Sequence, residues 1–170
     1  MAGKARRTSL LPFDGKRHDH GLCIEKALSE AERLCAQRGA RLTELRKRVL
    51  ALVWTSHSPV GAYDVLARLS EGHGRAAPPT VYRALGFLLE HGLVHRIESL
   101  NAFVGCPHPS ANHSGQFLIC RDCGAAAEMD VRAVDKAISA QAAACGFAVE
   151  GKTVEVRGLC PACQSAAAKP

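Results

Sequence analysis

Two pairs of closely spaced cysteines are the residues of this chain best suited to chemistry. Cys120 and Cys123 form one Cys-x-x-Cys pair, Cys160 and Cys163 form the other, and 36 residues separate the pairs. Four thiolates in a tetrahedral arrangement suit Zn²⁺, which has no redox chemistry and accepts sulfur ligands. A thioredoxin-like redox pair occurs once and begins a helix. The duplicated pairs therefore indicate a closed structural zinc site.

A looser set of possible ligands combines two imidazoles, a thiol and a carboxylate. Its members are His95, Cys106, His113 and Glu128. His95 shares a predicted strand face with Leu93 and Ile97, so it is expected to point inward. Together the four groups make one complete tetrahedral shell. No compact motif fixes the set: each member alone fits an ordinary core or surface residue, and His108 satisfies the spacing as well as His113.

Four helices and two strands are predicted in the first part of the chain. The helices run from Leu22 to near Gly39, from the N-cap residue Thr43, from Ala62, and from about Thr80 to Glu90 after Pro79. Two β runs follow at 93–99 and 102–106. Helices followed by a β-hairpin are typical of a winged helix-turn-helix.

The second half of the chain predicts a small α/β domain. Its expected elements are a strand at 116–120, a strand near 125–129, a helix over about 132–144 and a strand at 153–157. These elements fill the interval between the cysteine pairs and can bring them together at one end of a sheet. The predicted fold class is therefore α+β.

Composition indicates a globular protein with a basic balance. Apolar residues make up 47% of the chain and charged residues 22%, with 22 Lys and Arg against 16 Asp and Glu. The net charge of +6 is weakly consistent with a polyanionic partner. No apolar run approaches the ~20 residues of a membrane span. Arg6-Arg7 lacks the apolar stretch that an export signal needs, so a cytoplasmic location is expected.

Four motifs, in order along the chain, carry a resemblance to a known family. They are Arg41-Leu42-Thr43-x-x-Arg46, Pro78-Pro79-Thr80-Val81-Tyr82-Arg83-Ala84-Leu85, Ile119-Cys120-x-x-Cys123-Gly124 and Leu159-Cys160-x-x-Cys163. Taken together they resemble the ferric uptake regulator family, and its zinc-sensing branch in particular. The similarity covers roughly residues 22–163.

This resemblance implies a domain plan. The plan has a basic disordered tail at 1–20, a winged-helix DNA-binding domain at 21–105, a hinge at 106–115, a dimerisation and zinc-binding domain at 116–164 and a tail at 165–170. It implies two zinc ions per subunit. The structural ion corresponds to the four paired cysteines, and the regulatory ion to His95, Cys106, His113 and Glu128.

Candidate DNA contacts lie on three of the predicted helices. They are Tyr63, Thr80, Tyr82, Arg83, Arg46 and Lys47. Arg83 falls opposite the apolar face of its helix, and its planar fork matches guanine in the major groove. Tyr63 matches a family position that reaches the bases, whereas Arg46 and Lys47 suit phosphates. Any single basic residue is equally well explained as a solvated surface charge.

The implied function is that of a zinc-responsive transcriptional repressor. It is expected to bind palindromic operator DNA as a zinc-loaded homodimer and to shut off zinc-uptake genes. The thiolate of Cys106 favours zinc or copper over Fe²⁺ and Mn²⁺, and zinc is the expected effector. An iron, manganese or peroxide sensor of the same family is the alternative. No His is followed two positions later by Glu, which excludes the deaminase motif. An enzyme, a small organic substrate and a membrane partner are not expected.

Overall fold

The computed structural model describes residues 13, 20–55, 58–73, 77–109, 115–129 and 131–167. From His20 onward these residues form two compact units, one within Asp14–Asn112 and the other within His113–Pro170. No helix in this part of the chain is long and apolar enough to cross a membrane.

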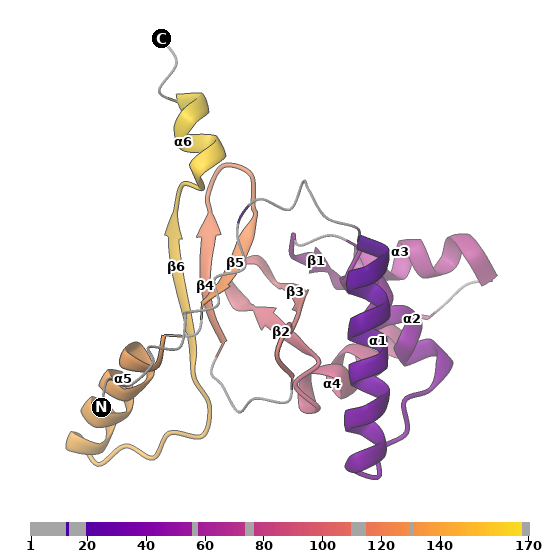
Figure 1. Cartoon of the computed structure of the whole chain (residues 1–170), viewed down its shortest axis with the longest axis horizontal. Helices are drawn as coiled ribbons and strands as arrows, with labels where there is room; N and C mark the ends of the chain where they lie inside the picture. The colour runs from indigo at the N-terminus through magenta and orange to yellow at the C-terminus, as the bar shows by residue number, and fades with distance from the viewer. Residues whose placement is uncertain are drawn as a thin grey trace, which may run out of the picture. The chain divides into compact units, whose positions relative to one another are not determined.

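Helices build most of the first unit. They are α1 (His20–Gln37), α2 (Glu44–Val53), α3 (Ala62–His73) and α4 (Pro78–Glu90) (Figure 1). The predicted apolar stripe of α1 is confirmed at Ala31 and Cys35, which are buried. Gly39 ends this helical region at φ 64°, a left-handed conformation that glycine adopts without strain. The predicted N-cap of α2 is also confirmed, because the Thr43 hydroxyl accepts a hydrogen bond from the Arg46 backbone N–H at 3.5 Å.

The last helix of this unit, α4, turns one face to the helical core. It begins with Pro78 and Pro79, whose missing N–H groups would have no partner within the helix. Val81, Leu85 and Leu88 are buried at helical spacing. The fourth predicted helix is confirmed, and its opposite side faces solvent.

A small sheet completes the first unit. β2 (Val94–Ile97) and β3 (Ala102–Gly105) pair antiparallel as predicted, and a 3₁₀ turn, η1 (Glu98–Leu100), connects them. A third strand, β1 (Val60–Gly61), pairs with β3 and is absent from the sequence prediction, since two residues carry no alternating pattern. The four helices with this hairpin form a winged helix-turn-helix.

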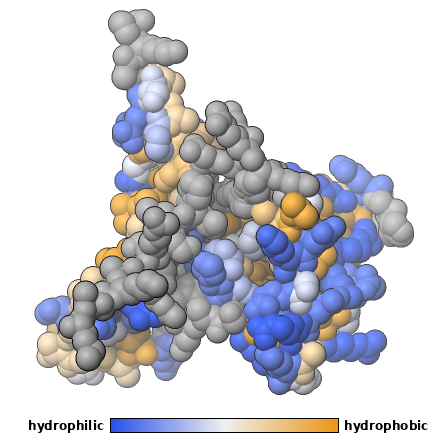
Figure 2. All heavy atoms as spheres, in the orientation of Figure 1, coloured by the Kyte–Doolittle hydropathy of each residue, from blue (hydrophilic) through white to orange (hydrophobic). Residues whose placement is uncertain are grey.

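The second unit is a three-stranded sheet with two helices. Its elements are β4 (Gly115–Cys120), β5 (Ala126–Met129), α5 (Arg132–Ala144), β6 (Thr153–Gly158) and α6 (Pro161–Ala167). Central β4 pairs antiparallel with β5 and parallel with β6 (Figure 1), and α5 lies in the long connection that parallel pairing needs. Hydrophobic residues remain on the surface of this unit (Figure 2); the large ones are Ile138, Phe147, Val149 and Val156.

Helix α6 extends into the segment that the sequence predicts as a C-terminal tail. Residues 165–167 of that segment are helical. The Ser165 hydroxyl donates to the Pro161 carbonyl at 2.9 Å, and the Gln164 backbone N–H donates to the Cys160 carbonyl at 2.9 Å. The alanines in this segment favour the helical state. With this change the predicted α+β fold class is confirmed.

Candidate metal centres and nucleic-acid interface

The four paired cysteines come together in the second unit. Cys120 ends β4, and the parallel register pairs it with Gly158, two residues before Cys160. The turn after β4 carries Cys123, and the first turn of α6 carries Cys163. All four sulfur atoms lie within 4.8 Å of one another. The sheet register therefore brings together two cysteine pairs that lie far apart in the sequence.

Backbone amides favour a negative charge on one sulfur of this cluster. The Cys160 N–H donates to Cys120 Sγ at 3.3 Å. Hydrogen bonds from the backbone N–H groups of Cys123 and, next, of Cys160 lower the pKa of Cys120 to about 6, because they stabilise the thiolate. Hydrogen bonds with the sulfurs of Cys160 and, next, Cys120 raise the pKa of Cys163 to about 12. A cation is therefore needed to hold all four sulfurs as thiolates.

The sulfur spacing matches the requirements of zinc. A Zn–S bond of ~2.3 Å at tetrahedral angles separates neighbouring sulfurs by about 3.8 Å. The sulfurs of Cys123 and Cys160 are 3.8 Å apart. All eight cysteines of the chain are free of disulfide bonds, so these sulfurs are available as ligands. With four protein ligands the cluster fits a closed structural site rather than a catalytic one.

A second pair of possible ligands lies on the hairpin of the first unit. The cross-strand register places His95 opposite Val104, so Cys106, two residues further, shares the face of His95. Their ligand atoms lie within 4.8 Å of one another. Val94 and Phe103 point to the other face, where they join the helical core. The hairpin thus turns one face to the core and presents an imidazole and a thiol on the other.

The remaining predicted ligands do not belong to the hairpin. Glu128 lies on β5 of the second unit and is 8% exposed. His113 lies outside the described residues, and its alternative His108 is exposed. His95 is only half-buried, whereas Ile97 on the same strand is fully buried, so the expected inward orientation holds in part. The four-ligand regulatory set remains a prediction.

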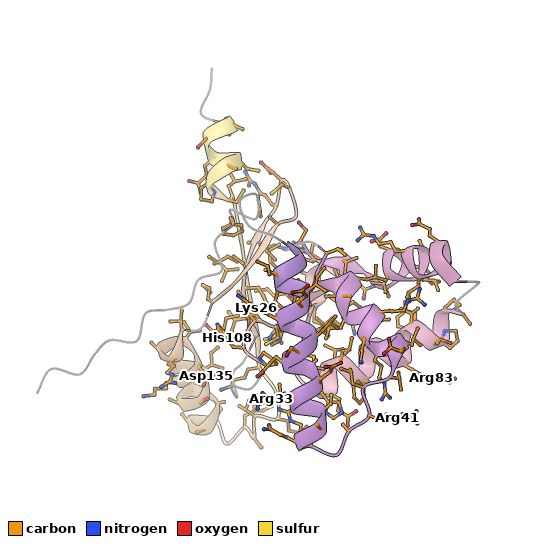
Figure 3. All side chains as sticks on the ribbon, turned by 45° about the vertical axis from the view of Figure 1, so that its right-hand side comes forward. Lys26, Arg33, Arg41, Arg83, His108 and Asp135 are labelled. Carbon is orange, nitrogen blue, oxygen red and sulfur yellow. The ribbon has the colours of Figure 1, made fainter. Side chains whose placement is uncertain are left out.

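The exposed side of α4 carries the residues predicted to read DNA. Arg83 is exposed, Tyr82 is 48% exposed and Thr80 is half-buried. Figure 3 shows Arg83 at the outer edge of the helical unit, with Arg41 projecting on the same side of the view. Tyr63 is 73% exposed on α3, which packs against α4. Exposed arginine and tyrosine side chains on adjacent helices form a surface suited to a polyanion.

A stacking contact on α2 is missing from the sequence analysis. The Arg46 guanidinium lies over the Phe87 ring of α4, 3.5 Å from its centroid, and donates to the Arg41 carbonyl. The His91 ring also lies beside Phe87, with ring centroids 4.2 Å apart. Cation–π contacts of this kind fix an arginine in place. The two residues come from different helices, so no local pattern could have revealed the contact.

Lys47, the other predicted phosphate contact of α2, is paired within the protein. Its Nζ lies 2.7 Å from a carboxylate oxygen of Glu32 and 3.2 Å from one of Glu44. Hydrogen bonds to Glu32 and, next, Glu44 raise the pKa of Lys47. The three-residue spacing from Glu44 is visible in the sequence as a helical ion pair, whereas the contact with α1 is not. A phosphate at Lys47 would compete with two carboxylates.

Comparisons with known proteins agree with this architecture. The model of the Ferric uptake regulator family matches residues 37–157. The zinc uptake regulation protein of Escherichia coli (strain K12) is 43% identical over 140 residues, which is 82% of each chain. A solved zinc uptake regulator complexed with zinc and DNA is 41% identical, with a TM-score of 0.83, over 86% of this chain and 98% of that one. The crystal structure of holo XcZur is 47% identical, with a TM-score of 0.77, over 82% and 98% of the two chains.

The family match includes helix α4, the hairpin and nearly all of the sheet of the second unit. The similarity to the zinc uptake regulators extends over more than two thirds of both chains. This chain belongs to the ferric uptake regulator family, on the branch of the zinc uptake regulators.

Proposed function

We propose that this protein is a zinc-responsive transcriptional repressor, which binds palindromic operator DNA as a zinc-loaded homodimer and shuts off zinc-uptake genes. The observation that carries the proposal is that a chain 43% identical to a zinc uptake regulation protein has both an exposed recognition helix and a four-sulfur cluster. A relative with a TM-score of 0.83 was solved in complex with zinc and DNA.

One zinc ion per subunit is assigned to the four-cysteine cluster, formed by Cys120, Cys123, Cys160 and Cys163. A zinc ion bound there would have four protein ligands, which leave no coordination position for a substrate. The thiolates then fasten the end of β4 to the start of α6, which lie at the same end of the sheet. The role is structural. We assign no catalytic residue, no small organic substrate and no enzymatic activity.

A second zinc ion per subunit is assigned to His95, Cys106, His113 and Glu128. An imidazole and a thiolate on one zinc ion are separated by about 3.6 Å, and His95 and Cys106 lie within 4.8 Å of one another on one hairpin face. A donor set with a thiolate favours zinc over Fe²⁺ and Mn²⁺, which prefer oxygen and nitrogen ligands. His108 is the alternative to His113.

Two ligands of this second ion, Cys106 and His113, lie in the segment 106–115, with His95 before the segment and Glu128 after it. We assign this segment as the hinge between the winged-helix domain, 21–105, and the dimerisation domain, 116–164. Ligation by all four residues restricts the hinge, so the two subunits hold their recognition helices at half-site spacing more often. The four ligands must bind zinc more tightly in the DNA-competent form. By linkage, operator DNA then tightens zinc binding by the same factor.

Operator recognition is assigned to the exposed surface of the helical unit. The proposed contacts are Tyr63, Thr80, Tyr82, Arg83, Arg46 and Lys47. Arg83 reads guanine through its two-pronged guanidinium in the major groove. Arg46 serves a phosphate from a position fixed by the Phe87 ring. Lys47 contributes less, because two carboxylates already pair with it.

The second unit offers the dimer interface. β6 lies at an edge of its sheet, and an exposed edge can pair with another strand. Phe147 is 67% exposed and Val156 on β6 is 46% exposed, so a second copy would cover apolar surface there. A symmetric dimer presents two recognition helices and reads a palindrome. Because its target is cellular DNA, we place the protein in the cytoplasm and away from membranes.

Operator binding after controlled metal loading tests this function. The protein is stripped of weakly held metal with a chelator that spares the four-cysteine site, and is then mixed with Zn²⁺, Fe²⁺ or Mn²⁺. We expect Zn²⁺ to give tight binding to DNA from a zinc-uptake promoter and weak binding to a scrambled duplex. Equal activation by Fe²⁺ or Mn²⁺ would support the alternative metal sensor, and binding unaffected by any metal would contradict the proposal.

A further inference from the structure

Gly105 and Trp54 make a close contact behind the hairpin ligands. Trp54 caps the C-terminal end of α2 and is 8% exposed in the helical core. A Cβ atom on Gly105 would lie 2.8 Å from Trp54 Cδ2 and still closer to Cε2 and Nε1. Such distances are shorter than real Cβ atoms show, so the indole rests directly on the Gly105 backbone.

This contact lies on the core side of the strand that carries Cys106. Successive residues of a strand point to opposite faces. Gly105 is paired with Val94, which belongs to the helical core, while Cys106 shares the other face with His95. The indole therefore supports β3 from behind, one residue before a proposed zinc ligand. It also joins the end of α2 to that strand.

Cys106 lies at the point where β3 ends. β3 ends at Gly105, and Cys106 is the first residue beyond it, where its backbone N–H donates to the Leu93 carbonyl at 3.1 Å. A metal site needs its ligands placed within about half an ångström, which the supporting residues usually determine. The buried indole packs against this strand end, directly on the Gly105 backbone.

We infer that Trp54 is a positioning residue for the regulatory zinc site, acting through the bare backbone of Gly105. This inference rests on the proposed function, because it presupposes that His95 and Cys106 bind zinc. It assigns to Trp54 and Gly105 a role in zinc affinity as well as in packing. Residues that support metal ligands typically change metal affinity by about 10–100-fold when altered.

Zn²⁺ titration against a competing chelator tests the inference, with metal analysis confirming that the four-cysteine site stays full. We expect Gly105→Ala to weaken binding of the second zinc ion by about 10–100-fold. The double variant Trp54→Leu/Gly105→Ala makes room for the added methyl and should recover most of that loss. Leu69→Ala is the matched control: Leu69 is 3% exposed on α3, so this variant loses core packing but should keep wild-type zinc affinity.

Trp54 also supplies an independent signal, because it is the single tryptophan of the chain. Its emission should change as the second zinc ion binds, and Cys106→Ser should abolish that change. If Gly105→Ala fails to fold, Trp54→Phe replaces it in the titration, since phenylalanine keeps the core filled but covers less of Gly105.

The outcomes separate the inference from the function on which it rests. A wild-type protein that binds one zinc ion per subunit contradicts the regulatory site itself. A wild-type protein that binds two, together with folded Gly105→Ala or Trp54→Phe proteins of unchanged second-site affinity, overturns the role of Trp54 alone. Equal weakening in Leu69→Ala would also overturn it, because the effect would then follow stability rather than ligand placement.

Discussion

The four-cysteine cluster and the hairpin ligand pair differ in how much of each site one unit contains. All four sulfurs of the cluster come from the second unit, where the register of β4 and β6 aligns their ends. In the proposed regulatory site, His95 and Cys106 are assigned from the hairpin, while Glu128 belongs to the other unit. A site that is complete within one unit can stabilise that unit. A site whose ligands are divided between units can instead make metal occupancy depend on their arrangement, as a sensor requires.

Cys120→Ser should have the largest effect, because it removes a ligand from the complete site. Zinc binding at structural sites is coupled to folding, so we expect the second unit to lose its zinc, its cooperative unfolding transition and its ability to dimerise. Metal analysis and analytical ultracentrifugation measure this. A metal-depleted Cys120→Ser protein that stays folded and dimeric would show that the cluster is dispensable.

Cys106→Ser should remove the proposed regulatory zinc site and leave the four-cysteine cluster unchanged. The variant is expected to keep one zinc ion per subunit and to lose the zinc dependence of operator binding, a coupling of about 1–3 kcal/mol. Fluorescence anisotropy on labelled operator, with and without added Zn²⁺, measures the coupling. Cys145→Ser is the matched control, since Cys145 is exposed at the end of α5. A full zinc response in Cys106→Ser would contradict the assignment.

Arg83→Ala should weaken operator binding without affecting either metal site. We expect a loss of about 1–3 kcal/mol on operator DNA with relaxed sequence preference, and unchanged zinc content. Competition between operator and random duplexes measures the preference. An equal loss on both duplexes would assign Arg83 to a phosphate rather than to a base.

Phe87→Leu should have the smallest effect of the four. The substitution keeps an apolar side chain but removes the ring beneath Arg46. We expect the free energy of unfolding to fall by about 0.5–1 kcal/mol, with both metal sites intact, as denaturant titration can measure. A change in zinc stoichiometry would mean that α2 and α4 affect the metal sites more directly than the structure indicates.

Local patterns predicted most of the fold. The apolar stripes of the helices, the Thr43 cap and the bounds of α5 at Arg132–Ala144 all depend on interactions between residues close in sequence. β1 could not be predicted, because its two residues form a strand only through pairing with β3. The helical residues 165–167 were assigned to a tail although their alanines favour a helix.

The candidate sites were predictable to the extent that a motif carries them. Two Cys-x-x-Cys pairs specify a cluster, which the structure assembles. Residue spacing offered His95 and Cys106 only as members of a loose candidate set, with ordinary core or surface residues as the alternative, and the family resemblance selected them as ligands. The contacts of Arg46 with Phe87 and of Trp54 with Gly105 join different elements. Such contacts depend on the tertiary fold, which no local spacing encodes.

The most direct test of the zinc-sensing account measures operator affinity and bound zinc in the same samples. Free Zn²⁺ is buffered across a range in which the four-cysteine site stays full, and anisotropy and metal analysis are recorded at each point. The account predicts that operator affinity rises as bound zinc increases from one to two ions per subunit. Operator affinity that stays constant while the second ion binds would contradict it.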